Sequence, residues 1–207
     1  MTFALDRSGL VGEDGPTHSG NYDIAYLRCI PNMVICTPSD ENETRKLLTT
    51  AYLHNGPASV RYPRGTGPNS NVDKDLKPLK IGEANIINEE SSEIVILNFG
   101  TLLNEANQIS KELKATLVDM RFVKPLDEKL LRELFKKAKV FISIEDGSIM
   151  GGAGSAVQEF ASKENLNVRS ILFGIPDKFI EHASREEMLV EAGLDVENIK
   201  SKLSKLL

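Results

Sequence analysis

Residues 33–63 read MVICTPSDENETRKLLTTAYLHNGPASVRYP, and this stretch decides the class of fold. The compact apolar run Met33–Cys36 is typical of a strand that is buried on both faces. Asp40 and Glu43 have the spacing of a capping box, which predicts that a helix begins there. An Asn-Gly-Pro sequence stops that helix, and residues 58–63 form the next strand. Strand, helix and strand in this order indicate a parallel sheet.

Strands and helices continue to alternate on both sides of this unit. Further strands are expected at residues 2–5, 81–87, 94–97, 115–119, 140–144 and 168–173. Helices are expected at residues 22–30, 40–54, 103–113, 127–138 and 154–163, then one opened by a Ser184–Glu187 capping box and one lined by Val196, Ile199, Leu203 and Leu207. Residues 64–78 hold glycine, proline, asparagine and charge but little that could be core. The sequence therefore predicts two α/β units joined by a linker.

Composition excludes several classes of protein. The 207 residues carry a formal net charge of −5, which argues against a generic nucleic-acid binder. Both cysteines, Cys29 and Cys36, sit in or beside apolar runs, so we expect them to be buried and reduced. The chain shows neither zinc-type spacing, nor a signal peptide, nor the ~20 apolar residues of a membrane helix. We expect a cytoplasmic protein without nucleic-acid or membrane partners.

Two stretches hold side chains that could carry chemistry. The first is residues 6–20, DRSGLVGEDGPTHSG, a glycine-rich loop with an arginine, three carboxylates and a histidine. It follows the first expected strand at once, which hints that the chain is a piece of something longer. The second is residues 60–65, where Arg61 and Arg64 flank the end of a strand. Arginine grips phosphate or carboxylate in a fork, although ion pairing with acidic surface is the simpler interpretation.

Because ligands in open α/β sheets sit at the carboxyl ends of strands, we expect a site near these loops. A third glycine-rich stretch, residues 145–155, could in principle cradle a phosphate at a helix N-terminus. It lacks the lysine of a P-loop and the spacing of a dinucleotide site. We expect a structural role there, with a tight turn and close packing of helix on strand.

Several motifs together resemble one family over essentially the whole chain. They are DRSG at residues 6–9, GEDGPTH at 12–18, RYPRG at 61–65, DMRFVKPLD at 119–127, MGGAGS at 150–155 and GIPD at 174–177. The GEDGPTH loop is found across the transketolase superfamily of thiamin-diphosphate enzymes. The RYPRG and DMRFVKPLD motifs narrow the resemblance to the 1-deoxy-D-xylulose-5-phosphate synthases, and to their C-terminal portion only.

The resemblance implies a fold and its limits. It predicts an α/β protein with part of a pyrimidine-binding, transketolase-like domain at residues 1–68 and a linker at 69–80. A complete transketolase C-terminal-type domain with a mostly parallel sheet follows at 81–207. The residues that hold the cofactors, thiamin diphosphate and Mg²⁺, lie upstream in the family. We therefore expect no cofactor-binding and no metal-binding residues in this chain, which by itself should be inactive.

The resemblance also implies a reaction and roles for four residues. The family condenses pyruvate with glyceraldehyde 3-phosphate, releases carbon dioxide and so begins the non-mevalonate isoprenoid pathway, which also feeds thiamin and pyridoxal synthesis. Arg7 and Arg64 would hold the substrate phosphate, Asp14 would bond the substrate, and His18 would serve as polar contact or proton relay. The expected partners are the two substrates and either a second copy or the missing N-terminal portion. Two alternatives stay open: another thiamin enzyme, such as a transketolase or an E1 β-type subunit, and a non-enzymatic assembly module.

Overall fold

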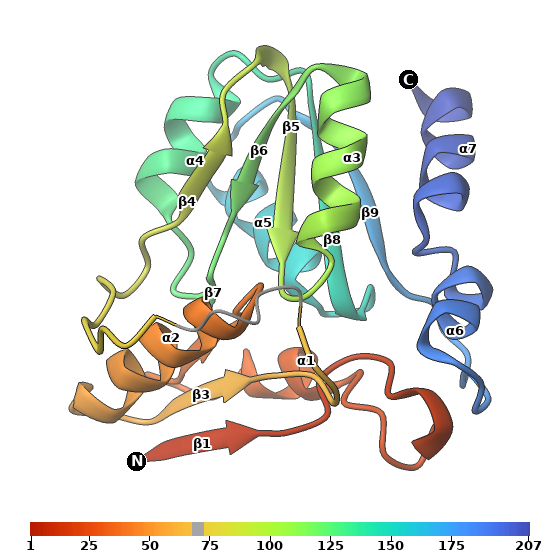
Figure 1. The fold of residues 1–207 in the computed structure, drawn as a ribbon. Coiled ribbons are helices and arrows are strands. Elements are labelled where there is room, and N and C mark those ends of the chain that lie inside the picture. Colours follow the sequence, from red (N-terminus) through yellow and green to blue (C-terminus); the bar gives the residue numbers. More distant parts are fainter. Residues whose placement is uncertain (68–72) are drawn as a thin grey trace.

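The β-α-β unit expected around residues 33–63 is present and lies in the first of two sheets (Figure 1). The computed structural model describes residues 1–67 and 73–207. The unit comprises β2 (Val34–Cys36), α2 (Glu41–Leu53) and β3 (Ala58–Arg61). As predicted, the Asp40 side chain caps α2 by accepting a hydrogen bond of 2.8 Å from the amide of Glu43. The carboxylate of Glu43, which was expected to complete the box, instead pairs with Arg121.

The first sheet has the strand order β1-β3-β2-β7. Its edge strand β1 (Thr2–Leu5) and β2 both pair in parallel with β3. The far edge, β7 (Phe122–Lys124), runs antiparallel to β2 and comes from the other half of the sequence. No strand was expected there, because three residues give no periodic signal and form a strand only through the distant partner.

The second sheet has the order β4-β6-β5-β8-β9. Its strands are β4 (Asn85–Asn88), β5 (Ser91–Phe99), β6 (Ala115–Asp119), β8 (Val140–Ser148) and β9 (Arg169–Ile175). The strands pair in parallel except for β4, which is antiparallel to β6. This arrangement confirms the predicted α/β class with a mostly parallel sheet.

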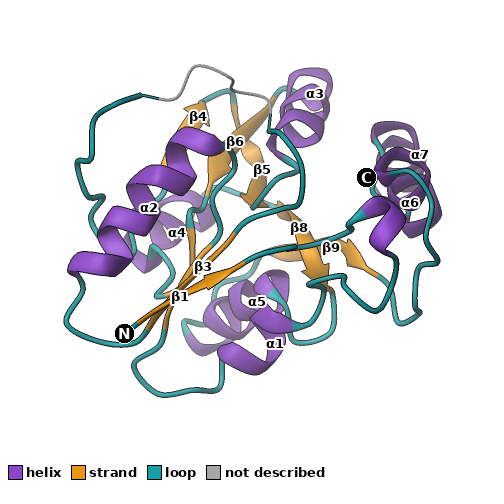
Figure 2. Ribbon diagram, turned by 60° about the horizontal axis from the view of Figure 1, so that its bottom comes forward, coloured by secondary structure: helices purple, strands orange, loops and turns teal. Residues whose placement is uncertain are grey.

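Helices cover both faces of the second sheet, as Figures 1 and 2 show. One face packs against α3 (Leu103–Leu113), α6 (Arg185–Ala192) and α7 (Val196–Leu206), and the other against α4 (Glu128–Phe135), α5 (Ala153–Lys163) and α1 (Asp23–Leu27). Successive residues of β5 serve opposite faces: Ile96 belongs to the first core, and Val95 and Leu97 to the second. The capping box that opens α6 is complete, as predicted.

Several boundaries differ from the sequence expectation. The helix expected at residues 22–30 ends at Leu27, because Pro31 prevents its extension and Lys124 Nζ donates to the carbonyls of Arg28 and Ile30. The strand expected at 140–144 continues to Ser148. The strand expected from residue 81 begins at Asn85. Residues 69–72 of the expected linker lie outside the described residues, and residues 73–80 form neither helix nor strand.

The two cysteines differ in burial. Cys36 is buried in β2, as expected, and burial raises the pKa of its thiol to about 12. The expectation for Cys29 was wrong: it is exposed, because the chain has already left α1, and its Sγ donates to the carbonyl of Tyr26. Among the helices of the described residues, none is long and apolar enough to cross a membrane.

Candidate functional site

The loop of residues 6–20 leaves the carboxyl end of β1 and is closed at its base by backbone hydrogen bonds. Gly9 donates to the carbonyl of Gly20 over 3.0 Å, and Gly20 donates to that of Arg7 over 2.8 Å. The amide of Ser8 donates to the carbonyl of Tyr62, just after β3. A side chain at position 20 could not be accommodated, since its Cβ would lie 2.5 Å from the Arg7 carbonyl oxygen. The base of the loop is thus tied to the end of the neighbouring strand.

Two arginines from separate loops meet on one carboxylate. Arg7 Nε donates to Asp14 Oδ2 over 3.1 Å, and Arg64 Nε lies 3.0 Å from the same oxygen. Arg7 also holds Asp6 through its Nη1 at 3.2 Å. Arg7 itself adopts a left-handed backbone conformation, with φ of 64°. Three of the four residues singled out in the sequence are therefore in direct contact, although they come from the loops after two different strands.

Asp14 ends a short 3-10 turn, Gly12–Asp14, that the next residue holds in place. Gly15 has a φ of 67°, and a Cβ there would lie 2.9 Å from Cβ of His182. The hydrogen bond from Arg7, together with the positive charge of Arg64 and the nearby imidazole of His18, holds the pKa of the Asp14 carboxyl below its ordinary value. The carboxylate is consequently ionised at neutral pH.

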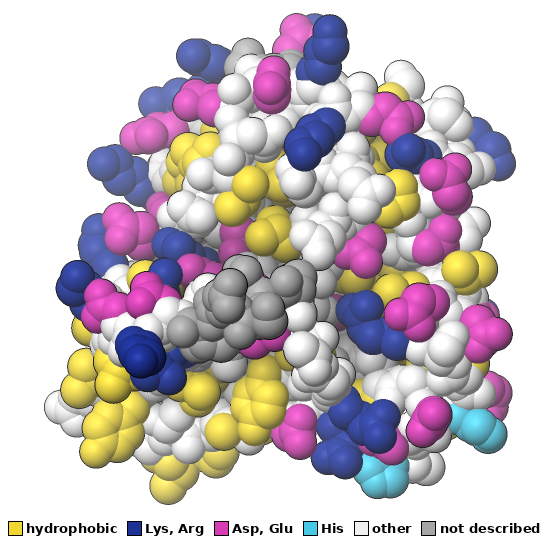
Figure 3. Space-filling model, viewed as in Figure 1, with side chains coloured by type: hydrophobic (Ala, Val, Ile, Leu, Met, Phe, Trp, Pro, Cys, Tyr) yellow, Lys and Arg dark blue, Asp and Glu magenta, His cyan; other side chains and the backbone are white. Residues whose placement is uncertain are grey.

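His18, the fourth predicted residue, is exposed on the same loop. Its backbone amide donates to the carbonyl of Gly15 over 3.2 Å, and its Nδ1 lies 2.9 Å from the hydroxyl of Thr17. Among the described contacts of the ring, Nε2 has no partner. Figure 3 shows basic and histidine side chains gathered over this part of the surface, at the lower right.

A cleft of about 610 Å³ adjoins these residues. Of the four site residues predicted from the sequence, Arg64 is the one found among the described residues that line the cleft. Other walls are formed by Tyr62, by Thr101 after β5 and by Arg185 at the start of α6. Arg64 therefore joins the cleft to the contact with Asp14 and Arg7. The described residues include no group of three or more His, Cys, Asp or Glu side chains that could hold a metal ion.

Comparison with known families gives this geometry a context. The transketolase pyrimidine-binding domain matches residues 1–69, and the transketolase C-terminal domain matches residues 82–199. This chain belongs to the transketolase family. As in the sequence expectation, the resemblance runs through both parts of the chain.

Comparison with curated proteins shows which group of transketolase-family enzymes this chain resembles. The chain is 53% identical over 201 residues to the 1-deoxy-D-xylulose-5-phosphate synthase of Pseudomonas fluorescens (strain Pf0-1), a match that covers 97% of this chain and 32% of that protein. The synthase of Pseudomonas syringae pv. tomato is 51% identical over 207 residues, covering 100% and 33%. The resemblance inferred from the motifs is thus confirmed. The chain spans about a third of the length of these relatives.

Solved transketolase structures share the fold. A split-gene transketolase in the form of an inactive β4 tetramer superposes with a TM-score of 0.83 at 26% identity, covering 99% of this chain and 66% of that one. A transketolase of Campylobacter jejuni has a TM-score of 0.70 at 21% identity, covering 99% and 31%. Both likenesses confirm the predicted class of fold.

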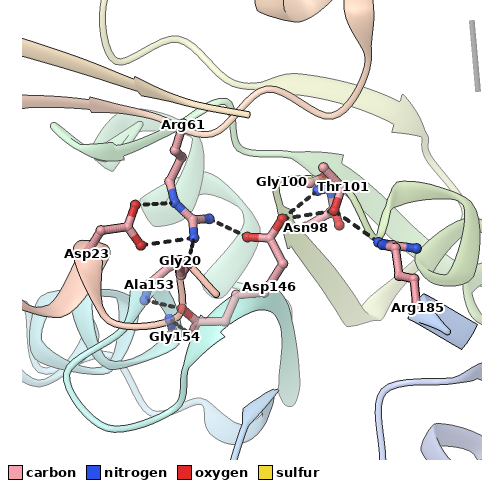
Figure 4. A network of polar contacts seen from close by, with 11 residues as sticks. Gly20, Asp23, Arg61, Asn98, Gly100, Thr101, Asp146, Ala153, Gly154 and Arg185 are labelled. Carbon is pink, nitrogen blue, oxygen red and sulfur yellow. Dashed lines mark hydrogen bonds and ion pairs between the residues drawn. The ribbon is translucent and has the colours of Figure 1, made fainter. Parts of the chain in front are cut away.

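The transketolase-type architecture also contains buried polar residues whose positions sequence reasoning missed. Arg61, considered as a possible anion grip, is buried and pairs with Asp23 and Asp146 (Figure 4). Glu145, also buried, accepts hydrogen bonds from the amides of Ala153 and Gly154 at the start of α5, and burial raises its pKa to about 7. The feature of the sequence that could have indicated this buried network is the pair of adjacent acids, Glu145 and Asp146, at the end of an apolar strand.

The glycines of residues 145–155 have the structural role expected of them. A Cβ on Gly154 would collide with Ser143 Oγ and lie 3.0 Å from the side chain of Leu172. A Cβ on Gly152 would collide with the carbonyl of Ser148. The stretch therefore allows α5 to pack closely against β8 and β9.

Proposed function

We propose that this chain is part of an enzyme that condenses pyruvate with glyceraldehyde 3-phosphate, releasing carbon dioxide, to give 1-deoxy-D-xylulose 5-phosphate. The identity of 51–53% with synthases of that name supports the proposal. The carrying observation is that Arg7 and Arg64, from loops after different strands, converge on one oxygen of Asp14. The enzyme would act in the cytoplasm at the entry to non-mevalonate isoprenoid synthesis, and would feed thiamin and pyridoxal synthesis.

The arginine pair suits the phosphate of the aldehyde substrate. A dianionic phosphate is held best by guanidinium groups that approach from more than one side. Among the described contacts, Arg64 uses only Nε, so its terminal nitrogens remain available to a ligand. Arg7 retains Nη2 in the same way. Phosphate bound here would orient the aldehyde, and remote binding of this kind supplies energy for placing the reacting carbon.

Asp14 and His18 are proposed to act on the rest of the substrate. Asp14, kept ionised by its arginines, accepts a hydrogen bond from a substrate hydroxyl group. His18 donates a proton from Nε2 to the oxygen of the aldehyde as that oxygen becomes an alkoxide. Proton transfer by a positioned imidazole is a common form of general acid catalysis.

Thiamin diphosphate would supply the nucleophilic two-carbon unit when bound. The described residues contain no cluster that fits its Mg²⁺ ion, so no step here runs through that ion. We place its binding residues in the remaining two thirds of the enzyme, and propose that the chain works either joined to that portion or in a homodimer. The inactive β4 tetramer of a split-gene transketolase supports the idea that such a piece alone does not turn over.

Substitution of the arginines in the complete enzyme tests the phosphate role. Arg64→Ala and Arg7→Ala should each raise KM for glyceraldehyde 3-phosphate by about 10- to 100-fold, the cost of a charged hydrogen bond. KM for pyruvate should stay within about twofold. Arg132→Ala is a matched control, because Arg132 pairs with Glu128 and Glu164 on another surface. Equal effects on both substrates would reject the role.

A second candidate is a different transketolase-type enzyme, favoured by the structural likeness to the split-gene transketolase. An assay of the complete enzyme with two sugar phosphates and no pyruvate separates the two. Turnover in that assay would favour a transketolase, and turnover that requires pyruvate would favour the synthase.

A further inference from the structure

Arg61 contacts Gly20, the last residue of the loop that carries Arg7, Asp14 and His18. It is the last residue of β3 and its side chain is 1% exposed. Figure 4 shows its guanidinium group at the centre of a polar network drawn from several elements. Nothing in the proposed chemistry uses this residue, so its role must be sought in what it holds.

The guanidinium group binds three partners at once. Nε donates to Asp23 Oδ2 over 2.8 Å, and Nη2 donates to Asp23 Oδ1 over 3.0 Å. Nη2 also donates to the carbonyl of Gly20 over 2.9 Å. Nη1 donates to Asp146. Burial alone would disfavour the charged form, but the carboxylates of Asp146 and Asp23 outweigh it, and the pKa of Arg61 lies above its ordinary value.

Each partner fixes a different part of the loop. Gly20 closes the base of the loop by bonding Arg7 and Gly9, so a hold on its carbonyl is a hold on Arg7. Asp23 begins α1, the element into which the loop runs. Asp146 packs against the start of the loop at Gly9, where an added Cβ on Gly9 would lie 3.0 Å from the Cβ of Asp146.

Asp146 is itself anchored to the second sheet. It belongs to β8, and its Oδ2 accepts hydrogen bonds from the amide and the hydroxyl of Thr101, over 3.2 Å and 2.9 Å. Through this carboxylate, Arg61 connects the loop to the sheet that packs against it. The connection depends on a planar fork, because a lysine ammonium has one nitrogen and cannot reproduce the four hydrogen bonds that three guanidinium nitrogens make here.

We propose that Arg61 is a positioning residue: by holding Gly20, Asp23 and Asp146 together it sets the placement of Arg7 and Asp14 against Arg64. The expected change in KM rests on the proposed function, but the effect of Arg61 on the loop does not. With this role, the site extends inward from the exposed residues to a buried cation that touches no substrate.

Arg61→Lys in the complete enzyme is the principal test, with two readouts. KM for glyceraldehyde 3-phosphate should rise about tenfold or more while KM for pyruvate changes less than about twofold, since small misplacements are costly. Hydrogen exchange at the amides of residues 7–20 should become faster. Arg121→Lys is the matched control: Arg121 also forks onto a carboxylate, Glu43, at 2.7 and 3.0 Å, but contacts no residue of the loop.

The possible outcomes separate clearly. Unchanged KM and unchanged exchange in Arg61→Lys, or equal changes in Arg121→Lys, would overturn the proposal. If Arg61→Lys does not fold, Asp23→Asn decides, because it removes one charge and one acceptor while keeping the shape; it should change both readouts in the same direction, and no change would overturn the idea. If the wild-type enzyme makes no product from the two substrates but Arg61→Lys still shows faster exchange of the loop amides, the proposed function is rejected and the positioning role stands.

Discussion

His18 offers the most direct test of chemistry at the level of a single residue. The Thr17 hydroxyl lies 2.9 Å from its Nδ1, and we propose that its Nε2 donates the proton to the aldehyde oxygen. In the complete enzyme, His18→Gln should lower kcat by about 10²- to 10⁴-fold, the usual contribution of a general acid. KM for glyceraldehyde 3-phosphate should change little, because we propose that the arginines, and not His18, hold the phosphate. Steady-state kinetics would show this, and a loss confined to KM would contradict the proton-transfer role.

Asp119 should make the stability of the chain depend on pH. It is buried at the end of β6, accepts a hydrogen bond of 2.6 Å from Ser39, and burial raises its pKa from 3.8 to about 7. Between these values the folded chain retains a proton that the unfolded chain has lost. Its contribution to stability is therefore full below about pH 4 and is lost as the pH rises towards 7, at up to about 1.4 kcal/mol per pH unit.

Asp119→Asn removes this titration, so the variant should lose less stability than the wild type between pH 5 and pH 7. Urea unfolding at the two pH values measures the difference. Asp177→Asn, at an exposed position, is the control and should follow the wild type. Parallel pH profiles for Asp119→Asn and the wild type would show that Asp119 is ionised in the folded chain throughout this range.

The sequence predicted which residues would gather, but not how the buried ones pair. Arg7, Arg64, Asp14 and His18 were identified by resemblance, and strand topology explains why the loops after β1 and β3 are neighbours. Arg61 and Asp146 lie 85 positions apart. Strand alternation says which face a side chain is on, but it does not say which distant carboxylate it meets.

At the scale of elements, the packing of α5 on the second sheet depends on Gly154. Gly154→Ala should destabilise the chain by about 1–3 kcal/mol, the usual cost of overpacking. The Ser143 hydroxyl, which the new Cβ would strike, has no hydrogen-bond partner in the described structure. Ser143→Ala should therefore be mild alone and should recover part of the loss in combination with Gly154→Ala. A double-mutant cycle from urea unfolding measures this coupling, and strict additivity would contradict the close contact.

Long, strongly patterned elements were predictable, and short ones were not. The helices at residues 103–113 and 154–163 match α3 and α5 closely because their apolar stripes and stop signals agree. The strand β8 extends through Glu145 and Asp146, where local polarity suggests a loop. Those carboxylates are buried because helix amides and Arg61 satisfy them, which depends on tertiary structure.

At the scale of the whole molecule, the chain should be unable to hold the cofactor of its family alone. Calorimetry of the isolated, folded chain with thiamin diphosphate and Mg²⁺ should show no measurable binding, because the chain spans about a third of its relatives. The complete enzyme under the same conditions is the positive control. Tight Mg²⁺-dependent binding to the isolated chain would contradict the assignment of the cofactor to the remaining portion.

The antiparallel strand β7 has a consequence for how this polypeptide could be divided. It comes from residues 122–124 yet borders β2 of the first sheet. If a protease cut the backbone anywhere between Gly67 and Ile81, the two products would still be held together by the pairing of β7 with β2 and by the ion pair of Arg121 with Glu43. Conversely, if residues 1–80 were expressed by themselves, β2 would become an unpaired edge strand, which is prone to aggregation.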